Sequence, residues 1–387
     1  MRILVATDQW SPDVVGGSAR VAADTARALA RRGHEVVVVT RAQSGLTEVE
    51  HDAGVEVRRV LRRGRFPQTL TDPVTSFRHA RSLRGRSFDV LVAHQATNAA
   101  GLHAARLDAP LAFVFHASLT LEMQFARRRQ GLHGIALYML APAFAALERT
   151  ALRHASSVLV LSDFSRELVG RRRPSAVDRV HVVGGAVDEA FFSDAPDPDA
   201  CRTRLGIPPG TLLFTARRLE PRMGVDVLID ALSLLDDQRV VLAVAGSGSS
   251  RGTLEDKVRV LGLQERVRLL GRVSEEDLRS LYAAADLFVL PTVAYEGFGM
   301  STVEALAAGT PVLGTAVGAT PEIVGRLGRE FVVPKAEPAV LAAAIRDALP
   351  LLDAELRTRA RRLAEAHYRW DHAILRWEEA LLDIRRR

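Results

Sequence analysis

Two glutamates lie eight positions apart around a Gly-Phe-Gly turn, in the stretch EGFGMSTVE at 296–304. The stretch follows an apolar run, DLFVLP, that predicts a buried strand. Gly297 and Gly299 would let the backbone turn into a helix, whose first amide groups have no partner within the helix. Helix starts bind anions, so the amides of Gly299, Met300 and Ser301 could bind phosphate oxygens.

The carboxylates on either side of this turn supply a second kind of contact. Glu296 precedes the turn and Glu304 lies one turn into the expected helix, so both could accept hydrogen bonds from sugar or ribose hydroxyls. A local alternative exists for Glu304, because residues 301–304 fit a capping box in which Ser301 caps the helix. Capping does not explain the glycines. Amides for phosphates and carboxylates for hydroxyls together predict a nucleotide-sugar site.

Other predicted strand ends carry residues that could serve the same ligand. Arg218 follows the strand LLFTA and could bind a diphosphate in a bidentate manner, with a surface arginine as an equal alternative. His116 ends the strand LAFVFH, where a structural role is as common as a functional one. Gly16 and Gly17 precede a long amphipathic helix, so the backbone there could approach a ligand closely.

The elements that would position these residues alternate regularly along the chain. Short apolar strands and amphipathic helices follow one another, which predicts an α/β protein with parallel sheets covered on both faces. The expected strands lie at 3–7, 35–40, 89–94, 111–116, 157–162, 212–216, 240–246, 266–271, 286–291 and 311–314. A second helix after the Gly-Phe-Gly turn should begin at Pro321, capped by Thr320.

A stretch at 180–202 that is rich in Gly, Pro and Asp separates the two groups of strands and marks the expected domain boundary. Each half then forms a doubly wound domain, 1–190 and 191–365, that binds ligands beyond the carboxyl ends of its strands. The last residues, 366–387, have apolar side chains at helical spacing and predict a helix that braces one domain against the other. Those side chains are Trp370, Ile374, Trp377 and Leu381.

Composition limits the class of protein. The 387 residues exceed one ordinary domain, 48% are hydrophobic, and no apolar run approaches the roughly 20 residues that span a bilayer, so we expect a cytoplasmic protein of two domains. One cysteine, Cys201, excludes an intramolecular disulfide and a multi-cysteine metal site. The net charge of +6 is dispersed, and no nucleic-acid-binding motif is present. The arginine clusters 127–129 and 171–173 could contact an anionic membrane surface or an acidic acceptor, or be solvated helix ends.

Taken together, these motifs resemble the family 4 glycosyltransferases of GT-B fold, over the whole chain. The stretch from Glu296 to Glu304 resembles the E-x7-E signature of that family. VHVVGGAVD at 180–188 is similar to its inter-domain turn, VAGSGS at 244–249 to its Gly-x-Gly strand end, and 261–291 to its nucleotide-base segment. The resemblance implies two Rossmann-like domains that face each other across a cleft, with the C-terminal helix packed back on the N-terminal domain.

The resemblance also implies a role for each candidate residue. Glu304 would bind the donor ribose and Glu296 the hydroxyls of the donor sugar, while the backbone of 298–301 would contact the sugar and the diphosphate. The implied catalytic residues are His116 beside the transferred sugar, Glu296, and Arg218 on the diphosphate. The donor site would be completed by Gly16, Gly17, Arg222, Met223, Gly246, Arg272, Val273, Gly297, Phe298, Gly299, Met300 and Ser301.

Enzymes of this family transfer a sugar from a nucleoside-diphosphate sugar to an acceptor hydroxyl, with retention of anomeric configuration. The resemblance therefore implies no cofactor and no obligatory metal. UDP is the expected nucleotide and GDP the alternative. The acceptor, which could be a sugar, a glycolipid or a small secondary metabolite, should be selected by residues 117–150.

One departure from the family pattern affects the donor site. The pattern R-L-x-x-x-K-G corresponds here to residues 218–224, RLEPRMG, so Met223 takes the place of the lysine. Loss of one donor that stabilises developing charge removes roughly 2.7–4 kcal/mol of transition-state stabilisation. The neighbouring Arg222 could substitute.

Three other classes of function remain as alternatives. A dehydrogenase is disfavoured because no G-x-G-x-x-G follows the first strand, and it would have to bind a nicotinamide cofactor. A nucleotide-sugar epimerase or hydrolase on the same fold would consume the donor without an acceptor. A non-catalytic nucleotide-binding homologue, which Met223 suggests, would show no turnover with any acceptor.

Overall fold

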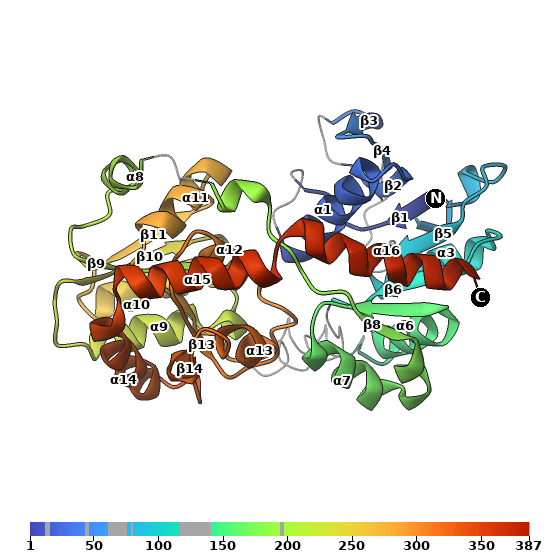
Figure 1. The fold of residues 1–387 in the computed structure, drawn as a ribbon. Helices are drawn as coiled ribbons and strands as arrows, with labels where there is room; N and C mark the ends of the chain where they lie inside the picture. The colour runs from blue at the N-terminus through green and yellow to red at the C-terminus, as the bar shows by residue number, and fades with distance from the viewer. Residues whose placement is uncertain are drawn as a thin grey trace. The chain divides into compact units, whose positions relative to one another are not determined.

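A computed structural model of the chain describes residues 1–11, 16–42, 46–60, 76–78, 80–116, 139, 141–193 and 197–386. The chain divides into two compact units (Figure 1). The first comprises Met1–Gly185 and Trp370–Arg387, and the second comprises Ala186–Arg369. The junction after Gly185 lies inside the stretch 180–202 that the sequence marks as the boundary, and the C-terminal segment belongs to the first unit. The roles of the two units in acceptor and donor binding stay predictions.

An eight-stranded sheet forms the first unit, in the order β3-β4-β2-β1-β5-β6-β7-β8. Its strands are β1 (Arg2–Ala6), β2 (Glu35–Arg41), β3 (Val49–Asp52), β4 (Val55–Val60), β5 (Val90–Ala93), β6 (Leu111–Val114), β7 (Ser157–Val160) and β8 (Val180–Val182). All neighbours are parallel except β3 and β4. The strands β5, β6 and β7 are wholly buried, as expected for a parallel sheet that helices cover.

The antiparallel pair β3–β4 is not predicted by the apolar pattern, because the segments VEHD and VEVRRV are rich in charge. Its turn at Ala53 and Gly54 has φ values of 47° and 86°. A two-residue type I′ turn requires positive φ at both positions, and this turn gives the sheet its antiparallel edge.

The helices whose bounds the structure describes in the first unit are α1 (Gly17–Arg31), α3 (Ala96–Ala105), α6 (Ala141–His154), α7 (Asp163–Arg172) and α16 (Trp370–Arg386). The last of these, α16, packs on α1, β5, β6 and β7 (Figure 1). Its apolar residues predicted to face the protein, Ile374, Trp377 and Leu381 among them, are all buried. This confirms that the C-terminal helix packs on the N-terminal unit.

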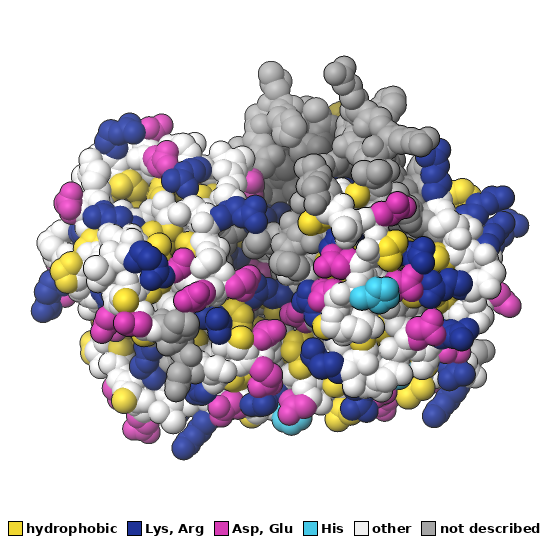
Figure 2. All heavy atoms as spheres, turned by 90° about the horizontal axis from the view of Figure 1, so that it is seen from above, with side chains coloured by type: hydrophobic (Ala, Val, Ile, Leu, Met, Phe, Trp, Pro, Cys, Tyr) yellow, Lys and Arg dark blue, Asp and Glu magenta, His cyan; other side chains and the backbone are white. Residues whose placement is uncertain are grey.

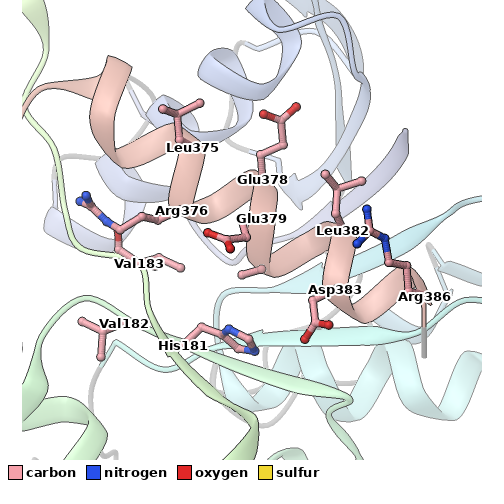
Figure 3. Close-up of a pocket in the computed structure, with 11 residues that line it drawn as sticks. His181, Val182, Val183, Leu375, Arg376, Glu378, Glu379, Leu382, Asp383 and Arg386 are labelled. Atoms are coloured by element: carbon pink, nitrogen blue, oxygen red, sulfur yellow. The ribbon is translucent and has the colours of Figure 1, made fainter.

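Polar contacts also hold α16 on the first unit. Glu378 accepts a hydrogen bond from Arg32 Nε at 2.7 Å and lies 2.8 Å from His34 Nε2, while Arg376 Nε donates to the carbonyl of Val183 at 3.0 Å. A groove of about 660 Å³ lies between β8 and this helix, and Figure 3 shows Glu379 and Asp383 on its helix side.

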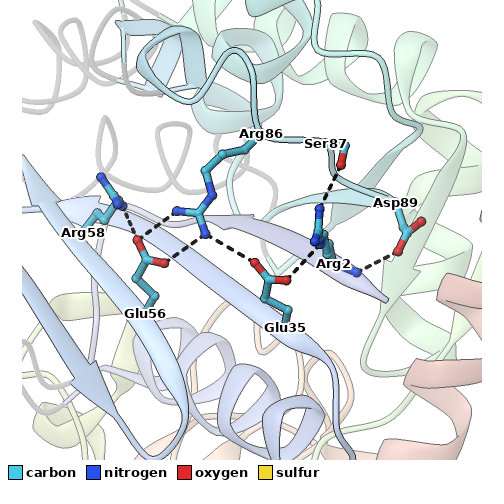
Figure 4. Close-up of polar contacts among 7 residues, drawn as sticks. All are labelled: Arg2, Glu35, Glu56, Arg58, Arg86, Ser87 and Asp89. Carbon is cyan, nitrogen blue, oxygen red and sulfur yellow. Dashed lines mark hydrogen bonds and ion pairs between the residues drawn. The ribbon is translucent and has the colours of Figure 1, made fainter.

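A charged network closes the amino end of the first sheet (Figure 4). Arg86 donates to Glu56 at 3.0 Å and to Glu35 at 3.3 Å, and Arg2 Nε lies 2.9 Å from Glu35. The backbone amide of Arg2 donates to Asp89 at 2.7 Å. The hydrogen bonds from Arg86 hold the pKa of the Glu56 carboxyl below its usual value. The network ties β1, β2 and β4 to the segment before β5, at the end of the sheet opposite the candidate site.

The second unit is built on a fully parallel six-stranded sheet in the order β11-β10-β9-β12-β13-β14. Its strands are β9 (Thr211–Ala216), β10 (Val240–Ala245), β11 (Val267–Gly271), β12 (Leu287–Leu290), β13 (Val312–Thr315) and β14 (Val332–Val333). Each of the ten strands expected from the sequence is present, with ends displaced by at most two residues.

The helices of the second unit are α8 (Pro198–Arg204), α9 (Val225–Ser233), α10 (Arg251–Val260), α11 (Glu275–Ala284), α12 (Met300–Ala307), α13 (Thr320–Val324), α14 (Pro338–Ala348) and α15 (Ala354–His367). The predicted cap of α13 was wrong. Thr320 is the first residue of that helix, and Ala319 precedes it without a side-chain capping bond.

Each sheet has one point at which the strand order reverses. In the first unit β1 lies between β2 and β5, and in the second unit β9 lies between β10 and β12. The connections that leave the two strands at such a switch point run to opposite faces of the sheet, and ligands of doubly wound domains bind there. The segments that follow β1, β5, β9 and β12 are therefore the ones in which to look for a site.

Basic and acidic side chains are interspersed over the face shown in Figure 2. The Arg171 side chain pairs with Glu167 at 3.1 Å, and Arg172 Nε lies 3.9 Å from Glu148, so both charges are compensated within the unit. The cluster 127–129 lies outside the described residues, and contact with a membrane stays a prediction. No described helix is both long enough and apolar enough to cross a bilayer.

Neighbouring residues of α16 allow a matched test of its packing. Ile374 is 4% exposed and Leu375 is 50% exposed. Ile374→Ala should lower the free energy of unfolding of the first unit by about 2–5 kcal/mol, whereas Leu375→Ala should change it by about 0.5 kcal/mol or less. All three tryptophans, Trp10, Trp370 and Trp377, belong to this unit, so urea titration followed by tryptophan fluorescence reports it. Equal losses in both variants would contradict the described packing.

Candidate functional site

The turn that carries Glu296 is fixed through its backbone. The Glu296 carbonyl accepts a hydrogen bond from the amide of Ala319 at 2.9 Å. Gly318, which precedes that amide, has a φ of 62°, and a β-carbon there would lie 2.0 Å from the same carbonyl oxygen. Only glycine allows this approach. The segments that follow β12 and β13 are therefore held together at Glu296.

The side chain of Glu296 is held by a buried arginine. Arg217 Nη2 donates to Glu296 Oε2 at 2.6 Å, and the Thr292 hydroxyl donates to the same oxygen at 3.3 Å. The side chains of Arg217 and Glu296 are 4% and 14% exposed. Burial lowers the pKa of the Arg217 guanidinium and the carboxylate of Glu296 opposes that shift, but an arginine in a protein keeps its charge. The two residues form a buried ion pair at the switch point of the second sheet.

The start of α12 lies beside this carboxylate. Gly299 is the residue before the helix, with a φ of 87°, and no side chain caps the first turn. The position that a β-carbon on Gly299 would take is 3.6 Å from Glu296 Cγ. Uncapped amides and the positive end of the helix dipole favour an anion at this point. Gly297 and Phe298 form the turn, and Phe298 is buried with its ring edge-on to Tyr368.

The capping-box interpretation was wrong. Because Gly299 adopts a left-handed conformation, the helix begins at Met300, and Ser301 lies inside the first turn rather than before it. Glu304 is 6% exposed, and its Oε2 accepts a hydrogen bond from the hydroxyl of Tyr282 at 2.8 Å. The tyrosine fixes the carboxylate, whose assigned contact with ribose stays a prediction.

The segment after β9 carries three more candidate residues. Arg218 is exposed, and its side chain makes no hydrogen bond or ion pair with any residue that the structure describes. Arg222 Nη1 donates to the carbonyl of Tyr295 at 3.0 Å, next to Glu296. Met223 is buried and ends a short 3-10 turn. All three lie on one segment that packs against the turn after β12.

Glycines bring the neighbouring loops close to that segment. Gly246, directly after β10, has a φ of 138°, and a β-carbon there would lie 1.7 Å from the Arg217 carbonyl oxygen. Its amide donates to the carbonyl of Gly271, the last residue of β11, at 2.7 Å. Arg272 and Val273 follow at once, the first exposed and the second half-buried. The candidate residues of the second unit therefore lie at the carboxyl ends of β9, β10, β11 and β12.

In the first unit, Gly16 and Gly17 lie where α1 begins. The Gly16 carbonyl accepts the first helical hydrogen bond, from Arg20 at 3.0 Å. Gly16 has a φ of 171°, which any residue can adopt, and a β-carbon there would meet only Gln9 Oε1, at 3.6 Å. Neither backbone conformation nor contact with a described residue requires glycine at this position.

A histidine pair occupies the ends of β5 and β6. His94 Nδ1 and His116 Nε2 are 2.9 Å apart, and His94 also stacks near Trp377, with ring centroids 6.4 Å apart. Burial lowers the pKa of His116 to about 4, and burial together with His116 lowers the pKa of His94 well below 6.5. Both rings are therefore neutral near pH 7, so one ring donates the shared hydrogen and the other accepts it.

Four residues of these clusters were not predicted from the sequence. The sequence positions of two of them could have indicated the site. Arg217 adjoins Arg218, and Thr292 directly follows the strand DLFVLP. His94 ends the strand DVLVAH as His116 ends LAFVFH. Tyr282 lies on α11, and nothing in the local sequence indicates its hydrogen bond to the carboxylate of α12.

The histidine pair predicts a specific dependence of stability on pH. Between pH 6.5 and about 4 the unfolded chain binds protons on His94 and His116 while the folded chain does not, so the first unit should lose stability as the pH falls through this window. His94→Gln should make the fall in the urea midpoint smaller, because glutamine does not titrate. His51 is exposed, so His51→Gln is the control, and its urea midpoint should fall with pH as that of the wild type does. An unchanged fall in His94→Gln would refute the account.

Two family models match the chain. One, Glycosyltransferase Family 4, covers residues 15–191, and the other, Glycosyl transferases group 1, covers residues 202–367. An uncharacterized glycosyltransferase of Methanocaldococcus jannaschii is 30% identical over 84% of this chain and 83% of its own length. The D-inositol 3-phosphate glycosyltransferase of Xylanimonas cellulosilytica is 30% identical over 97% of this chain and 93% of its own length.

Solved structures of similar fold agree with these matches. Sucrose-phosphate synthase from Thermosynechococcus elongatus superposes with a TM-score of 0.83 at 22% identity, over 99% of this chain and 98% of its own. Anabaena HepE in complex with UDP-glucose superposes with a TM-score of 0.77 at 22% identity, over 99% of this chain and 100% of its own. The two parallel-sheet units form the GT-B fold. The chain belongs to the family 4 glycosyltransferases.

Proposed function

We propose that this glycosyltransferase moves a hexosyl group from a UDP-sugar to an acceptor hydroxyl, with retention of anomeric configuration and without an obligatory metal ion. The observation that carries the proposal is the placement of Glu296 at the start of α12. Arg217 and Thr292 both bind its Oε2, and Oε1 has no partner among the described residues. A carboxylate oxygen that remains available beside an anion-binding helix start suits a sugar attached to a phosphate.

The charge that develops in the reaction supports the other parts of the proposal. As the bond between the sugar and the diphosphate breaks, negative charge grows on the phosphate oxygens. The start of α12 and the exposed guanidinium of Arg218 can stabilise that charge, so a metal ion is not required. With retention, a phosphate oxygen of the leaving group can take the acceptor proton on the same face. We therefore assign no separate general base.

The donor site extends along the ends of the strands. Glu304, fixed by Tyr282, would accept the ribose hydroxyls, and the backbone at Arg272 and Val273 would contact the base. Gly16 and Gly17 would lie against the diphosphate, which gives a reason for glycine that the described contacts do not. His116, neutral because it is buried, would hydrogen-bond a hydroxyl of the transferred sugar.

UDP is the first nucleotide to test, since Anabaena HepE, a structure of similar fold, is in complex with UDP-glucose. GDP is the alternative. The relatives named D-inositol 3-phosphate glycosyltransferase make D-inositol 3-phosphate a first acceptor to test. The segment expected to select the acceptor, 117–150, is described at 139 and 141–150 and otherwise lies outside the described residues.

The central prediction concerns Glu296 and Arg218. Glu296→Gln and Arg218→Ala should each lower kcat/KM by about 100-fold or more, because each removes a charge that contacts the donor. The measurement is UDP release from UDP-glucose with EDTA present, with and without acceptor. Glutamine is preferred to alanine at 296, because alanine would remove both side-chain oxygens that can accept a hydrogen bond from the buried Arg217. That loss would lower the free energy of unfolding by about 3–5 kcal/mol.

Arg239→Ala provides the matched arginine control, because this side chain is 84% exposed and lies just before β10, at the opposite end of the sheet. It should keep the wild-type rate. Near-normal rates in both Glu296→Gln and Arg218→Ala would refute the proposal. Donor consumption that never needs an acceptor would favour the hydrolase or epimerase, and binding without any turnover would favour the non-catalytic homologue.

A further inference from the structure

The family pattern places a lysine at the position of Met223, next to the donor diphosphate. Met223 is 7% exposed, and its side chain carries no charge. A transferase whose leaving group is a diphosphate needs cationic groups beside it. The question is whether another side chain brings a positive charge to this position.

Arg217 does so from the neighbouring end of β9. Its Nη2 lies 3.1 Å from the sulfur of Met223. That sulfur occupies the δ position, and the ammonium of a lysine at 223 would lie two bonds beyond it. The guanidinium therefore occupies the space next to the tip of residue 223, where the positive charge of a lysine would otherwise be.

The contacts of Arg217 leave part of its guanidinium available. Nη1 donates to Thr292 Oγ1 at 2.5 Å, and Nη2 donates to Glu296 Oε2 and Met223 Sδ. A guanidinium has five N–H groups, and three are used in these contacts. The N–H of Nε and the second N–H of Nη1 have no partner among the residues that the structure describes. A side chain that is 4% exposed would leave them unsatisfied unless a ligand or water binds there.

The other nearby arginines have different surroundings. Arg222 donates to the carbonyl of Tyr295, so its guanidinium supports the turn before Glu296. Arg218 already corresponds to the diphosphate arginine of the family pattern. The guanidinium of Arg217, by contrast, contacts the side chain of residue 223 directly.

We propose that Arg217 replaces the lysine of the family pattern, holding Glu296 through Oε2 and placing its charge beside the donor phosphate that carries the sugar. This inference rests on the proposed function, because it assumes a nucleoside-diphosphate donor at the start of α12. It makes Arg217 a positioning residue for Glu296 and a specificity determinant for diphosphate over monophosphate. It also explains why the chain can have methionine at 223.

The test compares the affinities for UDP and UMP, measured by calorimetry on the full chain. Arg217→Ala should lower the affinity for UDP by about 10- to 100-fold. The affinity for UMP should stay within about threefold of the wild-type value, because UMP lacks the second phosphate. Arg217→Ala combined with Met223→Lys should recover UDP binding to within about fivefold of the wild type, because the lysine restores the charge from the other side. If Arg217 had a structural role alone, its loss would lower the affinity for both nucleotides equally, and a lysine at 223 would not restore UDP binding.

Arg266→Ala is the control for loss of a buried arginine. Arg266 is 8% exposed, and its Nε donates to the carbonyl of Val240, at the amino end of β10. Its loss should lower stability without changing the ratio of UDP to UMP affinity. If Arg217→Ala does not fold, Arg217→Gln, which keeps hydrogen-bond donors without charge, should show the same loss of UDP binding.

The outcomes separate this inference from the proposed function. An unchanged ratio of UDP to UMP affinity in the Arg217 variants would overturn the inference alone. A double variant that binds UDP no more tightly than Arg217→Ala would do the same. If the wild type bound none of UDP, GDP and ADP, the proposed function would fall, and the inference with it.

Discussion

The buried guanidinium of Arg217 needs a partner for its charge, and Glu296 supplies it. Removing one member of a buried ion pair typically lowers stability by about 3–5 kcal/mol, so Arg217 and Glu296 are fixed together. The pair joins the end of β9 to the turn after β12, and it can form because these strands are hydrogen-bonded neighbours. The strand order thus places the carboxylate, and Gly318 permits the backbone approach that keeps it there.

The same principle of placement operates in the first unit. The strand order there reverses beside β1, and His94 and Gly16 follow β5 and β1, the two strands that meet at that point. The hydrogen bond between His94 and His116 gives each neutral ring a defined role, since one must donate and the other accept. In both units the side chains that could take part in chemistry lie at the carboxyl ends of strands. In the first unit the Arg86 network lies at the opposite, amino end of the sheet.

Most of the fold could be predicted from the sequence, because buried parallel strands are continuous apolar runs. The hairpin β3–β4 could not, since its charged segments lack that signal and its left-handed turn uses Ala53. Within the site, the motif around Glu296 was recognisable, but its partner was not. Arg217 and Arg218 are adjacent residues of the same type, and only the tertiary structure shows which one is buried. The capping of α12 was misjudged because a positive φ at Gly299 outweighed the preference of serine for the cap.

In the proposed function, the carboxylate fixed by Arg217 and the start of α12 together bind an activated sugar. A crystal structure of the protein with a UDP-sugar tests it most directly. We expect diphosphate oxygens against the first amides of α12, a sugar hydroxyl on Glu296 Oε1, and Arg217 still bound to Oε2. A donor bound away from the start of α12, or a Glu296 side chain turned away from the sugar, would contradict it.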